Sequence, residues 1–311
     1  MTDFSTTLAQ RIDSYIALQR SLGYAFCKQA AILRTFLRDV EANQLAGPLT
    51  QQMALDFVPS GGATPVCRAV RYAVLRRFAE YLAVYDSRTS ALDPRALPRS
   101  RAIPPPRILS DQELNRLFAA IDRLSPQHPQ RRQTLATLVG LLASTGLRSG
   151  EALRLDRADV DLTAGVLAVR QSKFHKDRLV PVHATTVAAL CEYARLRNLA
   201  FPQSHCPAFF VSLRGCRLSH TALNVAWREA CALAGLAEPH TKRPRPHDLR
   251  HRFVVTRLVT WHRQQADVQT LLPVLATYLG HTRYSDTAYS VTGTPELLGL
   301  AAERAFVGGG S

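Results

Sequence analysis

The chain has 311 residues, 46% of them hydrophobic, and a formal charge of +15 at pH 7. At about 100–200 residues per domain, this length predicts two domains. The positive charge comes mostly from arginines spread along the chain, so the folded body must present it, and nucleic acid is the expected partner. We find no run of about 18 apolar residues, signal peptide or lipidation motif, which argues against a membrane protein and predicts a cytoplasmic one.

Residues 5–86 have the pattern of a small helical bundle. Apolar residues recur at helical spacing in three stretches, and Pro65 marks the start of the last one. The stretches are defined by Leu8, Ile12, Tyr15 and Ile16, then by Leu33, Phe36, Leu37 and Val40, then by Val66, Val70, Val74, Phe78 and Leu82. Along the third helix, Arg68, Arg71, Arg76 and Arg77 lie mostly off the apolar stripe, which suits either contact with DNA phosphates or a solvated face.

The composition changes between residues 87 and 107, where five prolines and five arginines accompany one acidic residue. Proline at this density argues against a helix and predicts an extended linker between two domains. Because the segment is basic, it suits contact with a DNA backbone, and Arg99 and Arg101 are candidate DNA contacts.

A second domain, residues 108–311, is predicted to begin with a helix. Ser110 and Glu113 have the spacing of a capping box, and Leu109 and Leu114 that of a hydrophobic staple. A second helix carries Leu135, Leu138, Val139 and Leu142 and ends at the TG of residues 145–146.

Short strands follow in this second domain. VLAVR at 166–170 and RLVPV at 178–182 are rich in branched residues, with the polar QSKFHKD between them as a hairpin loop. If DRADVDL supplies the first strand, a three-stranded sheet results. Helical patterns return after Thr185. The predicted fold class is therefore mainly α with a small antiparallel β-sheet.

Three motifs in this domain carry chemistry. They are STGLRSGEALRL at 144–155, RPHDLRHRF at 245–253 and YLGHTRYSDTAYS at 278–290. Singly, each has an ordinary structural explanation, because an Arg–Glu pair three residues apart is usually a helix salt bridge. Together they supply two arginines and two histidines, which suit attack on a phosphodiester: guanidinium groups bind the non-bridging oxygens, and imidazoles add a hydrogen bond and a proton route.

The order of these motifs resembles that of the tyrosine recombinases, the lambda-integrase-type site-specific DNA recombinases. The shared features are TGLRxxE, a lysine in a β-hairpin, HxxR, LGH and a C-terminal tyrosine, and they span roughly residues 107–300. The resemblance implies a helical core-binding domain at 1–86, a linker at 87–107 and a catalytic domain at 108–311 with a C-terminal packing or exchange helix. It implies no metal and no nucleotide cofactor, because the family stores the bond energy in a covalent phosphotyrosine.

The resemblance also assigns roles residue by residue. Arg148 matches the first catalytic arginine and Glu151 its supporting acid, His247 and Arg250 match the HxxR pair, and His281 matches the LGH histidine. Lys173 matches the hairpin lysine that protonates the leaving 5′ oxygen, although the glycine that usually precedes it is absent. Lys176 is the competing candidate. Lys242 and Arg243 are further candidate DNA contacts.

The nucleophile departs from the family pattern. The family's tyrosine usually stands nine residues after the LGH histidine, and here that position is Ser290, while Tyr289 is one residue early. A shift of one residue on a helix turns a side chain through about 100°, and a serine hydroxyl is shorter in reach and less acidic than a phenol. We therefore expect that Ser290 replaces a tyrosine and that the chain as written binds DNA but cleaves it poorly; Tyr289 is the fallback nucleophile.

Other functions fit the sequence less well. The main alternative is a non-catalytic DNA-binding regulator that retains the fold. A type IB topoisomerase uses related groups but fits the two-domain layout less well. A metal-dependent nuclease lacks paired carboxylates at ligand spacing, and the six scattered cysteines suggest neither a zinc site nor a disulfide framework.

The resemblance implies partners as well as chemistry. It implies that the protein clamps a double-stranded DNA recombination site, as a homodimer on each site and a homotetramer in synapsis, in a bacterial cytoplasm and at the nucleoid. The apolar segment PELLGLAAERAF at 295–306 is either an amphipathic packing helix or a tail that docks onto the next protomer.

Overall fold

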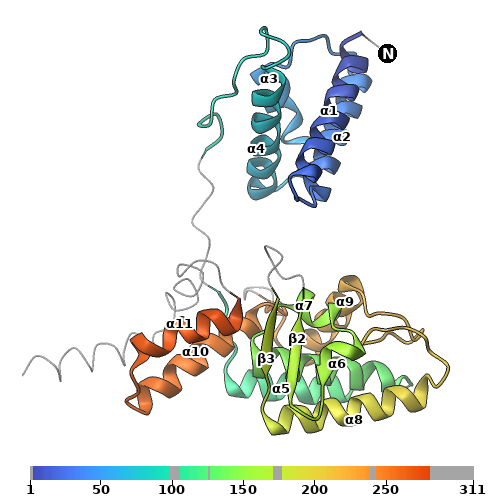
Figure 1. Ribbon diagram of the computed structural model, residues 1–311, viewed down its shortest axis with the longest axis vertical. Coiled ribbons are helices and arrows are strands. Elements are labelled where there is room, and N and C mark those ends of the chain that lie inside the picture. Colours follow the sequence, from blue (N-terminus) through green and yellow to red (C-terminus); the bar gives the residue numbers. More distant parts are fainter. Residues whose placement is uncertain (1–2, 99–105, 125–126, 171–176, 239–242, 281–311) are drawn as a thin grey trace, which may run out of the picture. The chain divides into compact units, whose positions relative to one another are not determined.

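The chain forms two compact units, Met1–Ile103 and Pro104–Ser311. The computed structural model describes residues 3–98, 106–124, 127–170, 177–238 and 243–280. Both units are mainly helical, and the second also holds a small antiparallel sheet (Figure 1). The predicted fold class is confirmed. Among the described helices, none combines the length and apolar character needed to cross a bilayer.

The first unit is a helical bundle. Its helices pack α1 against α2 and α4, and α3 against α4. Helix α4 begins where the Thr64 side chain accepts a hydrogen bond from the Cys67 amide, with Pro65 in the first turn. The elements are α1 (Asp3–Ser21), α2 (Cys27–Ala42), α3 (Gln51–Phe57), the 3-10 turn η1 (Ser60–Gly62) and α4 (Pro65–Leu82).

The buried face of α4 differs from the predicted stripe. Val66 and Val70 are 64% and 51% exposed, whereas Tyr72, Leu75 and Phe78 are buried. The predicted stripe used a spacing of four residues, and each such step advances about 40° around a helix of 3.6 residues per turn. Five residues at this spacing therefore cannot all lie on the buried face of α4. The first two, Val66 and Val70, lie on its solvent side.

The segment after α4 packs onto the first unit. Leu92 is 3% exposed and belongs to the same core as the four helices. The Tyr72 hydroxyl donates a 2.7 Å hydrogen bond to the Asp93 carbonyl, and the Asp93 amide donates one of 2.8 Å to the Gln51 side chain. The first half of the predicted linker 87–107 is therefore held against the bundle, and residues 99–105 lie outside the described part of the chain.

The second unit begins with the predicted capping box, in which Ser110 and Glu113 exchange hydrogen bonds. Its core forms mainly between helices, with α6 packed against α8 and α10, and α5 against α9, and strand residues such as Leu167 and Val180 join it. The helices are α5 (Asp111–Asp122), α6 (Pro129–Thr145), α7 (Ser149–Arg154), α8 (Ala184–Ala200), α9 (His220–Leu233), α10 (Asp248–Arg263) and α11 (Val268–Leu279), with the 3-10 turn η2 (Arg157–Asp159) after α7.

The sheet follows the predicted order. Strands β1 (Val160–Asp161), β2 (Val166–Val169) and β3 (Arg178–Pro181) form an antiparallel β1-β2-β3 meander. Leu167 lies opposite both Val160 and Val180, so one face of the sheet is buried. Strand β3 also contacts α11.

Candidate active site

A tight turn between α6 and α7 places Arg148. Gly146 ends α6 with φ 64°, and a Cβ at this position would lie 2.6 Å from Cδ1 of Phe253. Only glycine takes this conformation readily in so little space. The chain reverses here, and Arg148 becomes the residue that precedes the first turn of α7.

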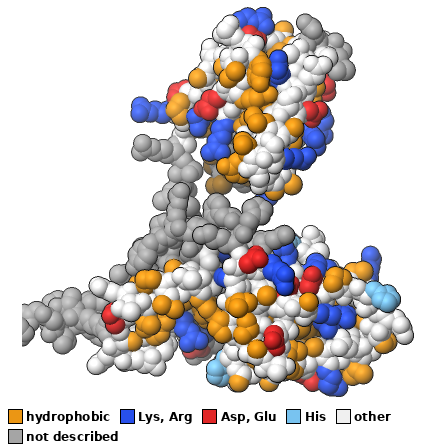
Figure 2. Space-filling model, in the orientation of Figure 1, with side chains coloured by type: hydrophobic (Ala, Val, Ile, Leu, Met, Phe, Trp, Pro, Cys, Tyr) orange, Lys and Arg blue, Asp and Glu red, His pale blue; other side chains and the backbone are white. Residues whose placement is uncertain are grey.

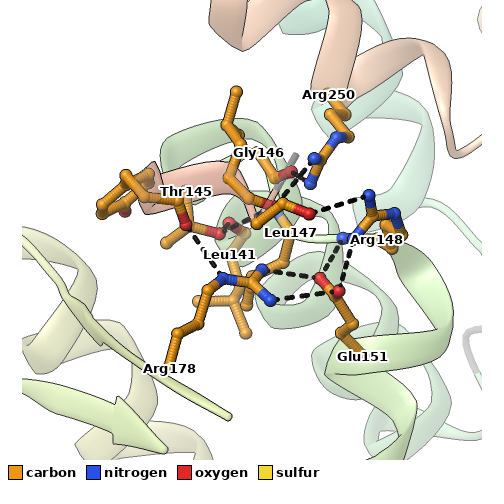
Figure 3. Close-up of polar contacts among 11 residues, drawn as sticks. Leu141, Thr145, Gly146, Leu147, Arg148, Glu151, Arg178 and Arg250 are labelled. Atoms are coloured by element: carbon orange, nitrogen blue, oxygen red, sulfur yellow. Dashed lines mark hydrogen bonds and ion pairs between the residues drawn. The ribbon is translucent and has the colours of Figure 1, made fainter. Parts of the chain in front are cut away.

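Glu151 holds Arg148 in two ways. Its carboxylate accepts a 3.0 Å hydrogen bond from the Arg148 amide. It also forms an ion pair with the Arg148 guanidinium, with 2.7 Å between nitrogen and oxygen (Figure 3). The Glu151 side chain is 2% exposed, and burial by itself raises a carboxyl pKa. Hydrogen bonds and charge from Arg178, followed by those from Arg148, outweigh this effect and lower the Glu151 pKa to about 2.

Three arginines meet at the end of α11. The carbonyl oxygens of Tyr278, Leu279 and Gly280 accept hydrogen bonds from Arg178, Arg250 and Arg148, at 2.9, 2.9 and 3.4 Å in that order. A helix C-terminus carries partial negative charge and unpaired carbonyls, which arginine side chains satisfy. These contacts join residues 29, 100 and 132 positions apart into one site.

Arg250 is the innermost of the three. The residue is 3% exposed and also donates a 2.8 Å hydrogen bond to the Gly146 carbonyl. It therefore contacts both the turn that precedes Arg148 and the end of α11.

His247 lies just before α10, at the N-cap position. The residue is exposed, and its ring meets the ring of His251 edge-on with 5.0 Å between centroids. Partial desolvation, the largest cause, lowers its pKa to about 4, and the positive charges of His251 and Arg250 add to the effect. His247 is thus a neutral imidazole near pH 7, open to solvent, beside a cluster of fixed positive charge.

The arrangement suits an anion. Arg148, Arg178 and Arg250 carry three positive charges and Glu151 one negative charge, which leaves a formal +2 on these four residues. The Arg148 side chain remains 25% exposed, so a ligand can reach its guanidinium. A guanidinium fork binds phosphate oxygens bidentately. Among the described residues, no three metal-ligating side chains come together.

The structure brings together only part of the predicted site. Arg148, Glu151 and Arg250 share one cluster, and His247 lies three residues before Arg250 in the chain. Other predicted catalytic positions lie outside the described residues; they are Lys173, Lys176, His281, Tyr289 and Ser290. Sequence reasoning missed Arg178, although the basic residue that opens the RLVPV strand was visible.

The predicted DNA contacts fall into two classes. Arg68, Arg77 and Arg243 are exposed, although Nε of Arg68 also donates a 2.9 Å hydrogen bond to the Ala63 carbonyl. Arg71 instead donates to the Ser60 carbonyl at 2.7 Å, and Arg76 pairs with Glu80 at 2.6 Å. Figure 2 shows basic side chains interspersed with hydrophobic ones on the visible face of the first unit. Arg99, Arg101, Lys242 and the segment 295–306 lie outside the described residues.

Comparison with known proteins identifies the family. Residues 107–290 match the phage integrase family. The chain is 61% identical over its full length, and over the full length of the relative, to y4rE of Sinorhizobium fredii, which is named as an integrase/recombinase. It is 30% identical to the tyrosine recombinase XerD of Vibrio cholerae over 81% of this chain and 83% of that one.

Solved structures share the fold at low sequence identity. A crystal structure of the XerH site-specific recombinase bound to its difH substrate aligns with a TM-score of 0.64 at 20% identity, covering 88% of this chain and 78% of that one. The Tn1549 transposon integrase in complex with transposon right end DNA aligns with a TM-score of 0.66 at 16% identity, covering 96% and 98%. The motifs, the arginine cluster and these likenesses agree: the chain belongs to the phage integrase family of tyrosine recombinases.

Proposed function

We propose that this protein is a site-specific DNA recombinase of the integrase or transposase type, which cuts and rejoins DNA through a 3′-phosphotyrosyl intermediate and a Holliday junction. The observation that carries the proposal is the meeting of Arg148 and Arg250 at the end of α11. Two guanidinium groups from distant segments converge there, as binding of one phosphate requires.

In the proposed cleavage step, a tyrosine oxygen attacks the scissile phosphorus, and the bond from phosphorus to the 5′ oxygen breaks. Arg148 and Arg250 neutralise the charge that grows on the non-bridging oxygens. Neutral His247 hydrogen-bonds the phosphate or takes the proton of the nucleophile. Lys173 gives a proton to the leaving 5′ oxygen, and religation reverses the step, so no outside energy source is needed.

Because serine occupies the nucleophile position, the chain as written should cleave DNA poorly. The segment that matches the family ends at residue 290, where this sequence has serine. A serine hydroxyl falls short of a phosphorus placed for a phenol and is much less acidic. The activity proposed for this chain is therefore DNA binding and synapsis, with efficient cleavage restored by Ser290→Tyr.

The proposed partner is a double-stranded DNA recombination site, bound by a homodimer and brought together in a homotetramer. The likeness to a lambda integrase tetramer bound to a Holliday junction, with a TM-score of 0.62 and 17% identity, supports this assembly. Exposed Arg68, Arg77 and Arg243 are proposed phosphate contacts.

A second candidate is a DNA-binding regulator that does not cleave. The observation that favours it is Ser290 itself, since the loss of the attacking oxygen abolishes the covalent step and leaves the phosphate-binding arginines in place.

The test compares three chains on one DNA. A bound site is first selected from a pool of random duplexes, and a nicked suicide version is incubated with the chain as written, with Ser290→Tyr and with Tyr289→Phe. A covalent adduct on a denaturing gel from Ser290→Tyr alone supports the disabled recombinase. An adduct from the chain as written that disappears in Tyr289→Phe makes Tyr289 the nucleophile. Specific binding without an adduct from any variant favours the regulator.

A further inference from the structure

One side chain outside the predicted catalytic set connects three parts of the site. Arg178, the first residue of β3, donates from Nη2 and Nη1 to the two carboxylate oxygens of Glu151, at 2.9 and 3.2 Å. Its Nε donates a 2.9 Å hydrogen bond to the Tyr278 carbonyl. The Arg178 side chain is 11% exposed, so these contacts lie almost entirely away from solvent.

The contact with Glu151 bears directly on Arg148. Both arginines bind the Glu151 carboxylate, and Arg178 donates hydrogen bonds to both of its oxygens. A bidentate pair fixes the plane of the carboxylate. The orientation of that plane sets the position of the oxygen that pairs with the Arg148 guanidinium. Without Arg178, the buried carboxylate loses half of its cationic partners and is free to turn about its side-chain bonds toward Arg148.

Arg178 also contacts the end of α11, whose carbonyls bind Arg148 and Arg250. A Cβ on Gly280 would lie 2.9 Å from Nη1 of Arg178, and Gly280 has φ 68°. The Arg178 guanidinium therefore packs flat against the turn that ends α11, next to the carbonyls held by Arg250 and Arg148. Because glycine leaves this space empty, the arginine can approach the turn closely.

We propose that Arg178 is a positioning residue for DNA strand cleavage, which holds Glu151, and through it Arg148, in register with the end of α11. The inference rests on the proposed function, in which Arg148 binds the scissile phosphate. We assign Arg178 no phosphate contact, because three of its five N–H groups are directed at Glu151 and Tyr278 and its side chain is only 11% exposed.

The test uses the full chain carrying Ser290→Tyr as the parent and single-turnover cleavage of the nicked suicide duplex. Arg178→Ala and Arg178→Lys are expected to lower the maximal cleavage rate about 100-fold, since a shift of about 1 Å in a catalytic group has an effect of that size. The DNA concentration at half-maximal rate is expected to change much less. Guanidinium ion, added at a non-denaturing concentration, is expected to restore part of the Arg178→Ala rate.

Arg170→Ala is the matched control. Arg170 follows β2 on the same hairpin and pairs with Asp159 at 2.7 Å, but its side chain is 65% exposed, and within the described residues it makes no hydrogen bond or ion pair with Glu151 or α11. Its removal is expected to leave the rate unchanged. Urea unfolding of each variant shows how much protein is folded, and the rates are compared per folded molecule.

A double-mutant cycle separates the possible outcomes. If Arg178 acts through Arg148, Arg178→Ala lowers neither cleavage nor DNA affinity further once Arg148→Ala is present. Three outcomes would overturn the inference while the proposed function stands. The cleavage losses of the two single variants could add in the double variant, Arg178→Ala could leave the cleavage rate unchanged, or its effect could appear only as weaker DNA binding. A parent that binds DNA without cleaving overturns the recombinase proposal and, with it, the role of Arg178 in strand cleavage. A parent that binds no DNA overturns both.

Discussion

Arg250 donates a 2.8 Å hydrogen bond to the carbonyl oxygen of Gly146, a residue 104 positions earlier in the chain. Gly146 stands two residues before Arg148, so one arginine of the site supports the turn that presents the other. The two arginines are therefore parts of one structure, and a change in the turn should affect both.

Replacement of Gly146 tests this turn. Gly146→Ala adds a Cβ 2.6 Å from the Phe253 ring at φ 64°, and we expect the free energy of unfolding to fall by about 1–3 kcal/mol. The matched control is Gly140→Ala in α6, where the added Cβ has 4.0 Å to its nearest neighbour and the stability should rise by about 0.5–1 kcal/mol. Urea denaturation measures both, and equal effects would contradict the account of the turn.

Replacement of Glu151 should alter how stability depends on pH. The Glu151 pKa is about 2 in the folded chain and 4.5 in its ordinary state. Its stabilisation is therefore complete above pH 4.5 and is lost as the pH falls toward 2, with a total of about 3 kcal/mol. The free energy of unfolding of Glu151→Gln should lie below that of the parent at pH 6, and the difference should shrink by pH 3.

The control for this experiment is Glu192→Gln. Glu192 pairs with Arg195, but both side chains are about half exposed, at 49% and 59%. Its replacement should change stability little at either pH, because solvent screens an exposed ion pair. A Glu151→Gln curve parallel to that of the parent from pH 6 to pH 3 would show that the carboxylate is not held as described.

His247 should titrate unusually low. Its pKa falls to about 4 in the folded chain, from an ordinary value of 6.5. The folded state takes up a proton less readily than the unfolded state, so this group lowers stability as the pH falls from about 6.5 toward 4. An NMR titration of the ring, with His247→Gln to identify its signal, should give a midpoint well below 6.5.

Bound DNA should reverse this shift. A phosphate near His247 stabilises the imidazolium, so the midpoint should move up when the selected duplex is added. A free-chain midpoint at or above 6.5 would contradict the electrostatic description of the site. An unchanged midpoint in the presence of DNA would place His247 away from the phosphate.

Exposed arginines of the first unit should contribute to the salt dependence of DNA binding. Arg68→Ala and Arg77→Ala should each lower the affinity for all duplexes alike and reduce the slope of log affinity against log salt by about 1. The control is Arg195→Ala in α8, because Arg195 is paired with Glu192 at 2.7 Å and lies in no predicted DNA-contact segment. Fluorescence anisotropy at several salt concentrations measures the slopes, and identical slopes for all three variants would exclude these residues as phosphate contacts.

Local patterns in the sequence predicted much of the fold. The capping box at Ser110, the end of α6 at Gly146 and the three short strands depend on residues close together in the chain, and each was found as expected. The stripe assigned to α4 was wrong at Val66 and Val70, because spacing by four residues spirals around a helix and only packing decides which face is buried.

The sequence by itself determined the family, the order of the motifs and the basic character that points to DNA, because residue types and spacings carry that information directly. Only the tertiary structure decided that Arg148, Arg178 and Arg250 hold three successive carbonyls at the end of α11. It also decided that Glu151 is shared between two of these arginines. Contacts between residues 29 to 132 positions apart depend on how helices and strands pack, and no local pattern encodes them.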